Sequence, residues 1–179
     1  AVIGGGVGTA IAYPVAKKLH DDGCHVDLIV GFRNKDLIIL KEEFEAASTN
    51  LIIGTDDGSY GKKALVTDLL KEQIEAGAQY DRVIAIGPVI MMKFVCLLTK
   101  EYNIPTVVSM NPIMIDGTGM CGGCRLSVGG ETKFACVDGP EFDGHLVDFD
   151  ESMARGAMYR DFELHAREET CNLFKQEVK

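Results

Sequence analysis

The sequence predicts an α/β fold in which a Rossmann-like, five-stranded parallel sheet is followed by a small glycine-rich domain. Short β-branched runs alternate with longer segments of helical period over roughly the first 110 residues. A glycine cluster separates the first strand from the first helix, and the composition changes sharply after Met110. Strands that alternate with helices need right-handed crossovers, which build a parallel sheet covered on both faces.

The elements follow one another in regular order. The predicted strands are Ala1–Ile3, His25–Val30, Asn50–Ile53, Arg82–Ala85 and Thr106–Ser109. The predicted helices are Thr9–Asp21, Asp36–Ala46, Thr67–Glu75 and Val89–Lys100. The first strand is short for the centre of such a sheet, so we expect this chain to be the C-terminal part of a longer one.

Beyond Met110 the chain is mostly loop, with eight glycines in under thirty residues. Arg125–Val128 and Lys133–Ala135 are predicted to pair as a hairpin across Gly129-Gly130. From Asp150 onward the sequence is charged and dotted with Met and Phe, which predicts a surface helix or a partner-docking tail. The expected domains are residues 1–110, 111–150 and 151–179.

Composition excludes two classes of partner. The net charge of -9 disfavours nucleic acid, because binding to a phosphate backbone depends on Lys and Arg. No apolar stretch approaches the roughly 20 residues that cross a bilayer, so no membrane association is expected. The sequence opens without a basic, apolar signal peptide, and we expect a soluble, cytoplasmic protein.

Three cysteines fall within sixteen residues and indicate a metal site. Asp116, Cys121, Cys124 and Cys136 form the pattern D-x4-C-x2-C-x11-C. Plant-type [2Fe-2S] sites use C-x4-C-x2-C and a more distant cysteine, so the spacing is the same with a carboxylate first. Glycines around these residues let the loop wrap closely, so that backbone N–H groups reach the cluster sulfides.

Two other interpretations of these cysteines stay open. A structural zinc site would use Cys121, Cys124, Cys136 and His145, although it leaves Asp116 unexplained. The thiols could also be unligated. The remaining cysteines lie elsewhere: Cys24 and Cys96 are expected to be small buried hydrophobes, and Cys171 is in the tail.

A second motif lies between the first strand and the first helix, where a dinucleotide pyrophosphate would need a close backbone and a helix N-terminus. The candidate residues are Gly4, Gly5, Gly6, Val7, Gly8 and Thr9. Their spacing does not match G-x-G-x-x-G/A. A simple glycine turn between strand and helix is the alternative.

Loops after other strands should meet this motif at the carboxyl edge of the sheet. They supply Arg33, Asp57, Gly58, Gly87 and Pro88 as further candidates for binding a nucleotide. Arg33 could pair with a phosphate or be a solvated surface charge, and Pro88 could simply begin a helix. Met91, Met92 and Met114 are expected mainly in the core.

These residues resemble the ferredoxin-NADP reductase superfamily. Gly4 to Thr9 match its glycine-rich loop, and Gly87-Pro88-Val-Ile-Met91 match its G-P-x-x-M segment, which makes Met91 a candidate cofactor contact; Ile86 stands where many members have cysteine. Electron-transfer subunits that append a [2Fe-2S] domain are most similar. They include the dihydroorotate dehydrogenase electron-transfer subunit and, through Asp116 to Cys124 and Phe134 to Gly144, the small subunit of NADH-dependent reduced ferredoxin:NADP oxidoreductase, or sulfide dehydrogenase.

The resemblance implies an oxidoreductase subunit with no catalytic acid or base. NADH or NADPH would exchange a hydride with FAD held by a β-barrel domain outside this chain, and single electrons would pass to the cluster. A larger iron-sulfur flavoprotein subunit, forming a heterodimer, and ferredoxin are the implied partners. Two alternatives stay open: a dihydroorotate dehydrogenase electron-transfer subunit, in which a cysteine replaces Asp116, and a noncatalytic NAD-sensing module with a zinc knuckle.

Overall fold

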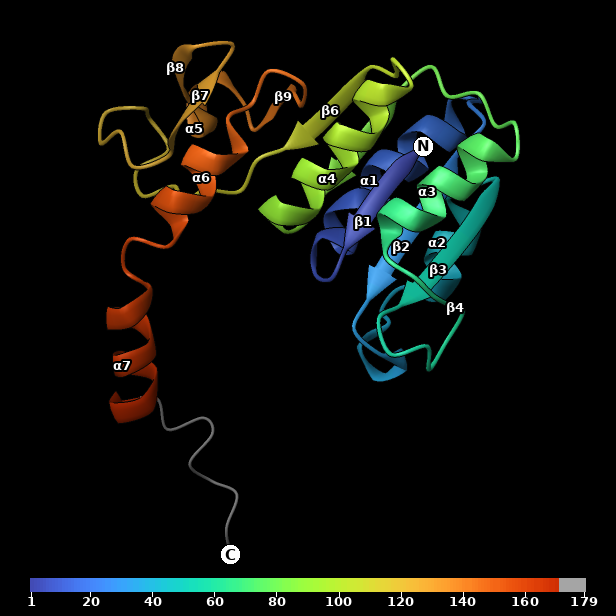
Figure 1. Ribbon diagram of the computed structural model, residues 1–179, viewed down its shortest axis with the longest axis horizontal. Coiled ribbons are helices and arrows are strands. Elements are labelled where there is room, and N and C mark those ends of the chain that lie inside the picture. The colour runs from blue at the N-terminus through green and yellow to red at the C-terminus, as the bar shows by residue number, and fades with distance from the viewer. Residues whose placement is uncertain (171–179) are drawn as a thin grey trace, which may run out of the picture.

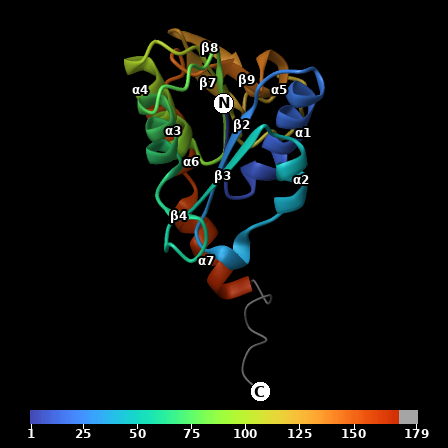
Figure 2. The same ribbon diagram turned by 90° about the vertical axis from the view of Figure 1, so that its right-hand side faces the viewer.

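The computed structural model describes residues 1–170, and its centre is a seven-stranded sheet with the order β4-β3-β2-β1-β5-β6-β9 (Figures 1 and 2). The five predicted strands appear as β1 (Val2–Gly5), β2 (Asp27–Phe32), β3 (Asn50–Thr55), β5 (Val83–Ile86) and β6 (Thr106–Ser109). All neighbouring pairs among them are parallel. The predicted parallel core is therefore present.

Helices cover both faces of this sheet, as parallel crossovers require. One face packs on α1 (Gly8–Asp21) and α2 (Lys41–Ala46), where Val2 and Leu28 contact a cluster that includes Phe44. The other packs on α3 (Val66–Glu75) and α4 (Val89–Glu101), where Ile3 and Ile29 join Leu70 and Met92. Successive residues of each strand point to opposite faces of the sheet and so pack into two separate hydrophobic clusters.

Two features of the sequence prediction were wrong. The sheet has seven strands rather than five, because the short strands β4 (Lys62–Lys63) and β9 (Glu141–Asp143) extend its edges. The predicted helix over Asp36–Ala46 is broken into a 3-10 turn, η1 (Lys35–Leu37), and α2. Leu40 causes the break, because its φ of 53° lies in the left-handed region and interrupts helical hydrogen bonding.

The glycine-rich segment forms the predicted hairpin. Strands β7 (Arg125–Val128) and β8 (Glu131–Phe134) pair antiparallel across Gly129 and Gly130, whose φ angles are 60° and 81°. A two-residue turn with both φ positive matches the right-handed twist of the strands. The one-turn helix α5 (Ala135–Asp138) follows β8 directly.

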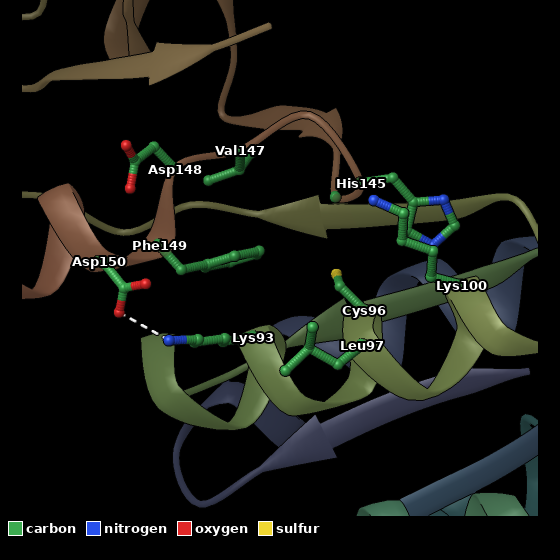
Figure 3. Close-up of a pocket in the computed structure, with 10 residues that line it drawn as sticks. Lys93, Cys96, Leu97, Lys100, His145, Val147, Asp148, Phe149 and Asp150 are labelled. Carbon is green, nitrogen blue, oxygen red and sulfur yellow. Dashed lines mark hydrogen bonds and ion pairs between the residues drawn. The ribbon is translucent and has the colours of Figure 1, made fainter.

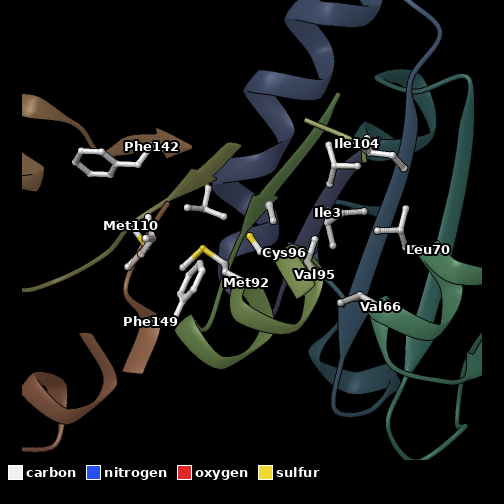
Figure 4. Packing of buried hydrophobic residues seen from close by; sticks show 14 of the residues in the cluster. Ile3, Val66, Leu70, Met92, Val95, Cys96, Ile104, Met110, Phe142 and Phe149 are labelled. Carbon is white, nitrogen blue, oxygen red and sulfur yellow. The ribbon is translucent and has the colours of Figure 1, made fainter. Parts of the chain in front are cut away.

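This segment shares a core with the sheet rather than standing apart from it. Strand β9 pairs antiparallel with β6, through Val108↔Phe142 and its neighbours. Figure 4 shows Met110, Phe142 and Phe149 beside Met92 of α4, all members of one buried cluster. The hairpin and its flanking loops are therefore anchored to the edge of the sheet.

The chain continues in two helices, where the sequence predicted a surface helix or a partner-docking tail from Asp150 onward. Helix α6 (Phe149–Gly156) packs near α4, and α7 (Arg160–Thr170) extends away from the body of the molecule (Figure 1). Cys171 lies outside the described residues. None of the helices within residues 1–170 is long and apolar enough to span a bilayer. The domain limits at residues 110 and 150 stay predictions.

Candidate functional site

The glycine loop makes a tight turn from β1 into α1. Gly6 has a φ of 53°, which is unfavourable for residues with a Cβ, and its N–H donates to the carbonyl of Gly31 on β2 (2.9 Å). The hydroxyl of Thr9 donates to the Gly6 carbonyl (2.7 Å) and is buried. Thr9 therefore fixes the turn from behind, while Gly6, Val7 and Gly8 form its outer surface.

The loop lies directly against the end of β5, because glycine permits a close approach there. A Cβ added to Gly8 would lie 2.6 Å from the carbonyl oxygen of Ile86, and one added to Gly5 would lie 2.4 Å from Sδ of Met91. Gly87 also packs on the Met91 side chain, at 2.9 Å from an added Cβ. Met91 is thus a half-buried support beneath the two glycine turns.

A cleft of about 650 Å³ opens above these turns, at the carboxyl ends of β1, β5 and β6. This is where the strand order reverses direction, the usual ligand position in an open α/β sheet. Among the candidates from sequence, it brings together Gly5, Gly6, Val7, Gly8, Gly87 and Pro88. Gly4, Thr9 and Met91 lie behind this surface and do not line it.

The cleft has a further wall that sequence reasoning missed. It is formed by Ser109, Met110, Asn111, Pro112, Met114 and Pro140, and Ile11 and Ile86 complete the lining. A signal was available for most of this wall, because Ser109 ends the fifth predicted strand and residues 110–112 follow it at the same edge of the sheet. Pro140 reaches the cleft through β9, which the sequence did not predict.

Arg33, Asp57 and Gly58 lie at the neighbouring ends of β2 and β3 and do not line the cleft. The N–H of Asp57 donates to the carbonyl of Arg33 (3.2 Å), so the two loops are joined. Hydrogen bonds from the hydroxyl and N–H of Ser59 lower the pKa of Asp57. Arg33 is exposed on this rim, beside the β1 end of the cleft.

Two of the four predicted metal ligands lie together. Cys124 precedes β7 and Cys136 follows β8, so the hairpin brings their Sγ atoms to 3.3 Å from each other. Two thiolates on one tetrahedral metal ion lie about 3.8 Å apart, from metal–sulfur bonds of about 2.3 Å. The pair therefore has close to the spacing of two ligands on one metal. The hydrogen bond between the Cys124 and Cys136 thiols, together with burial, raises the pKa of the Cys136 thiol.

The other two predicted ligands, Asp116 and Cys121, lie in the preceding loop and interact with each other through the backbone. The Asp116 carboxylate accepts from the N–H groups of Thr118 (2.9 Å) and Cys121 (2.8 Å). These donors, that of Thr118 foremost, hold the pKa of Asp116 below its ordinary value. The Cys121 sulfur accepts from the N–H of Gly123 (3.4 Å). Within residues 1–170, no three His, Cys, Asp or Glu side chains are already grouped as metal ligands.

His145, the fourth ligand of the zinc alternative, is placed elsewhere. Its Nε2 lies 3.0 Å from the Thr99 hydroxyl, in a smaller cavity of about 310 Å³ between α4 and the start of α6 (Figure 3). Cys96 lines the same cavity, and burial raises its pKa to about 12. Cys96 is buried as predicted, whereas Cys24 is exposed, contrary to prediction.

Two family models match this chain. Residues 2–97 match the oxidoreductase NAD-binding domain, and residues 111–148 match the iron-sulfur cluster binding domain of dihydroorotate dehydrogenase B. The first match contains the glycine loop and the Gly87-Pro88 turn. The second contains Asp116 and the three grouped cysteines.

Individual proteins of known sequence or structure are also similar. The chain is 60% identical to an uncharacterized protein in the adh 3' region of Clostridium beijerinckii, over 88% of this chain and 54% of that protein. It is 49% identical to the Thermotoga maritima dihydroorotate dehydrogenase B (NAD(+)), electron transfer subunit homolog, over 90% of this chain and 57% of that protein. One solved structure, of the NADH-dependent reduced ferredoxin-NADP oxidoreductase described for flavin-based electron bifurcation, contains a similar chain. The two chains superimpose with a TM-score of 0.85 and are 47% identical, over 93% of this chain and 60% of the other. This chain thus spans little more than half the length of these relatives.

Proposed function

The chain belongs to the oxidoreductase NAD-binding domain family, and we propose that it is part of the electron-transfer subunit of an NAD-dependent iron-sulfur flavoprotein oxidoreductase. The two matched segments are those that carry the glycine turns and the cysteines. The single observation that supports the proposal most is that β6 and β9 join these segments side by side at one sheet edge. A nucleotide cleft and a metal site that share one hydrophobic core are held close to each other, as the passage of electrons between their cofactors requires.

In the nucleotide cleft, the glycine turns let a pyrophosphate approach the backbone at the start of α1. The first N–H groups of a helix have no partner inside it and attract anions. No acidic side chain lies in the first turn of α1 to oppose them. The walls formed by Val7, Pro88 and Met110 are apolar and exclude water from a bound ring.

The cluster ligands of this proposal are Asp116, Cys121, Cys124 and Cys136, which would hold a [2Fe-2S] cluster. The donor set fits it, because three thiolates and one carboxylate stand at the plant-type spacing and two of the sulfurs are already close. Gly117, Gly119 and Gly122, all with positive φ, let the backbone wrap closely. When bound, the nicotinamide supplies hydride chemistry and the cluster single-electron chemistry, while the chain provides orientation and electrostatics.

The complete protein is proposed to contain an FAD-binding domain outside this chain and to pair with a larger iron-sulfur flavoprotein subunit. The length and the names of the relatives support both points, since this chain spans 54 to 57% of two of them. Ferredoxin as a redox partner, the choice between NADH and NADPH, and a cytoplasmic location remain predictions of the sequence.

Metal analysis of the full-length protein, purified without air, tests the proposed cluster. We expect two irons and two acid-labile sulfides for this site and no zinc. Cys136→Ser should remove most of both, because it deletes one of the two paired sulfurs. Cys24→Ser is the matched control and should keep them, since Cys24 is exposed and lies far along the chain. Stoichiometric zinc in the wild type would contradict the proposal.

A second candidate is a dihydroorotate dehydrogenase electron-transfer subunit, favoured by the name of the Thermotoga relative. Asp116 argues against it, since the family resemblance implies a cysteine at that position in such subunits. Co-purification from the native organism separates the two. A partner that oxidises dihydroorotate supports this second candidate, and a larger iron-sulfur flavoprotein without that activity supports the first.

A further inference from the structure

The lining of the nucleotide cleft carries few polar side chains. Among the described residues that line it, only Ser109 and Asn111 carry a polar side chain; the others are glycine, proline or apolar. Apolar ligand sites depend on a few well-placed polar groups to orient what they bind. Within this chain, the polar groups that can orient a ring in this cleft are therefore these two side chains and the backbone.

The position of the cleft indicates which half of a dinucleotide it receives. In Rossmann-like sheets the adenosine ribose lies at the end of the second strand, and the other half crosses to the opposite side of the switch point. Here the cleft is built from the ends of β1, β5 and β6, away from β2 and β3. It therefore faces the nicotinamide half.

The backbone on both sides of the exposed Asn111 is constrained. The N–H of Met110, a buried residue, donates to the Pro140 carbonyl (2.9 Å), and Pro112 restricts the backbone on the other side. The Asn111 side-chain amide Nδ2 lies 3.4 Å from the carbonyl oxygen of Gly87, a long hydrogen bond between two neighbouring residues of the lining. A carbonyl oxygen only accepts, so the NH2 end of the side chain is the one that faces Gly87.

Within residues 1–170 this is the only hydrogen bond of the Asn111 side chain, so Oδ1 and the second N–H are available to a ligand. A primary amide offers one acceptor and two donors, and it complements another primary amide. The nicotinamide ring carries such a group in its carboxamide. Ser109 offers one hydroxyl only.

We infer that Asn111 binds the carboxamide of nicotinamide and so determines how the ring is oriented against Gly87-Pro88. The inference rests on the proposed function, because it needs a nicotinamide dinucleotide in this cleft. It makes the peptide that leads into the cysteine loop part of the nucleotide site.

Binding of two ligands to the full-length protein tests this role. NAD+ and ADP-ribose share the adenosine and pyrophosphate, but ADP-ribose lacks the nicotinamide ring. In calorimetric titrations, Asn111→Ala and Asn111→Asp should weaken NAD+ binding about three- to tenfold, the range for one lost neutral hydrogen bond. ADP-ribose affinity should stay within about twofold of the wild type, and Tm should be unchanged.

Asn103→Asp is the matched control, because Asn103 lies between α4 and β6. It precedes the amino end of β6, whereas the cleft lies at the carboxyl ends of the strands. This variant should leave both affinities unchanged. If the Asn111 variants weaken both ligands equally, or neither, the assignment of Asn111 is overturned while the nucleotide site stands. If the wild type binds neither ligand, the proposed function fails together with this inference.

Discussion

Gly8 is the residue of the glycine loop that packs most closely against backbone atoms. The Cβ of Gly8→Ala would lie 2.6 Å from the Ile86 carbonyl oxygen and 2.7 Å from Cα of Gly87, so backbone rather than a flexible side chain must move. We expect the free energy of unfolding to fall by about 1–3 kcal/mol, as for other overpacked sites. NAD+ affinity should fall as well, because β5 and α1 separate. Chemical denaturation and calorimetry measure the two effects.

Gly156→Ala is the control for that substitution, since an added Cβ there meets nothing within 4 Å. Gly156 lies at the end of α6, where alanine is the better helix former. Stability should be unchanged or slightly higher. An unaltered Gly8→Ala protein would show that the contact between α1 and β5 is less rigid than described.

Asp27 is a buried carboxylate far from the cleft. It accepts hydrogen bonds from Tyr80 (2.7 Å), Asn50 (2.7 Å) and the His25 ring (3.0 Å). Burial alone would raise the pKa of Asp27, but these partners outweigh it and hold the pKa below its ordinary value of 3.8. Folding therefore favours the ionised form.

This network makes stability depend on pH in a definite direction. A carboxyl whose pKa is lowered by folding contributes stability above its unfolded pKa and loses it as pH falls through the folded value. Asp27→Asn should lower the free energy of unfolding by about 1–3 kcal/mol at pH 7. Urea titrations of both proteins should show that difference shrinking below about pH 4. A difference independent of pH down to pH 2 would contradict the account.

At the scale of elements, the hairpin β7–β8 positions Cys124 and Cys136, and its turn depends on two left-handed glycines. Gly130 has a φ of 81°, and Gly130→Ala should cost about 1–2 kcal/mol. Gly129→Asn should be tolerated, because Asn-Gly suits this turn type. Iron and sulfide content should follow the same order as thermal stability. Equal cluster loss in both variants would show that the turn does not set the cysteine positions.

Elements with a clear period were predictable, and irregular ones were not. The five parallel strands and α1, α3 and α4 follow directly from alternating β-branched and helical runs. Leu40 carries no turn signal, so its left-handed conformation could not be foreseen. Likewise β4 and β9 are too short for periodicity, and β9 exists because β6 offers it an edge.

The candidate site divides in the same manner. The glycine cluster between a strand and a helix pointed to one site, and the cysteine spacing pointed to the other. The wall from Ser109 to Pro112 was missed because no motif marks it, although its position at the end of the fifth predicted strand places it at the same edge of the sheet. Pro140 enters only through the pairing of β9 with β6. The position of His145 against Thr99 depended on the same tertiary contact.

At the scale of the molecule, the sheet and the cysteine-bearing segment share one buried cluster, so they should unfold together. Phe142 and Met110 belong to it, and Phe142 leaves no room for a Cβ on Gly139. Phe142→Ala should destabilise the whole chain by about 3–5 kcal/mol. Denaturation followed both by fluorescence of bound NADH and by cluster absorbance should give coincident transitions. Two separated transitions would mean that the parts are independent.

The central claim is that Asp116, Cys121, Cys124 and Cys136 hold a [2Fe-2S] cluster. Low-temperature EPR of the full-length protein, purified without air and reduced with dithionite, tests it most directly. We predict the signal of a one-electron-reduced [2Fe-2S] cluster, with line positions that change in Asp116→Cys because the ligand to one iron changes from oxygen to sulfur. A colourless protein without such a signal, or a signal unaltered by Asp116→Cys, would contradict the account.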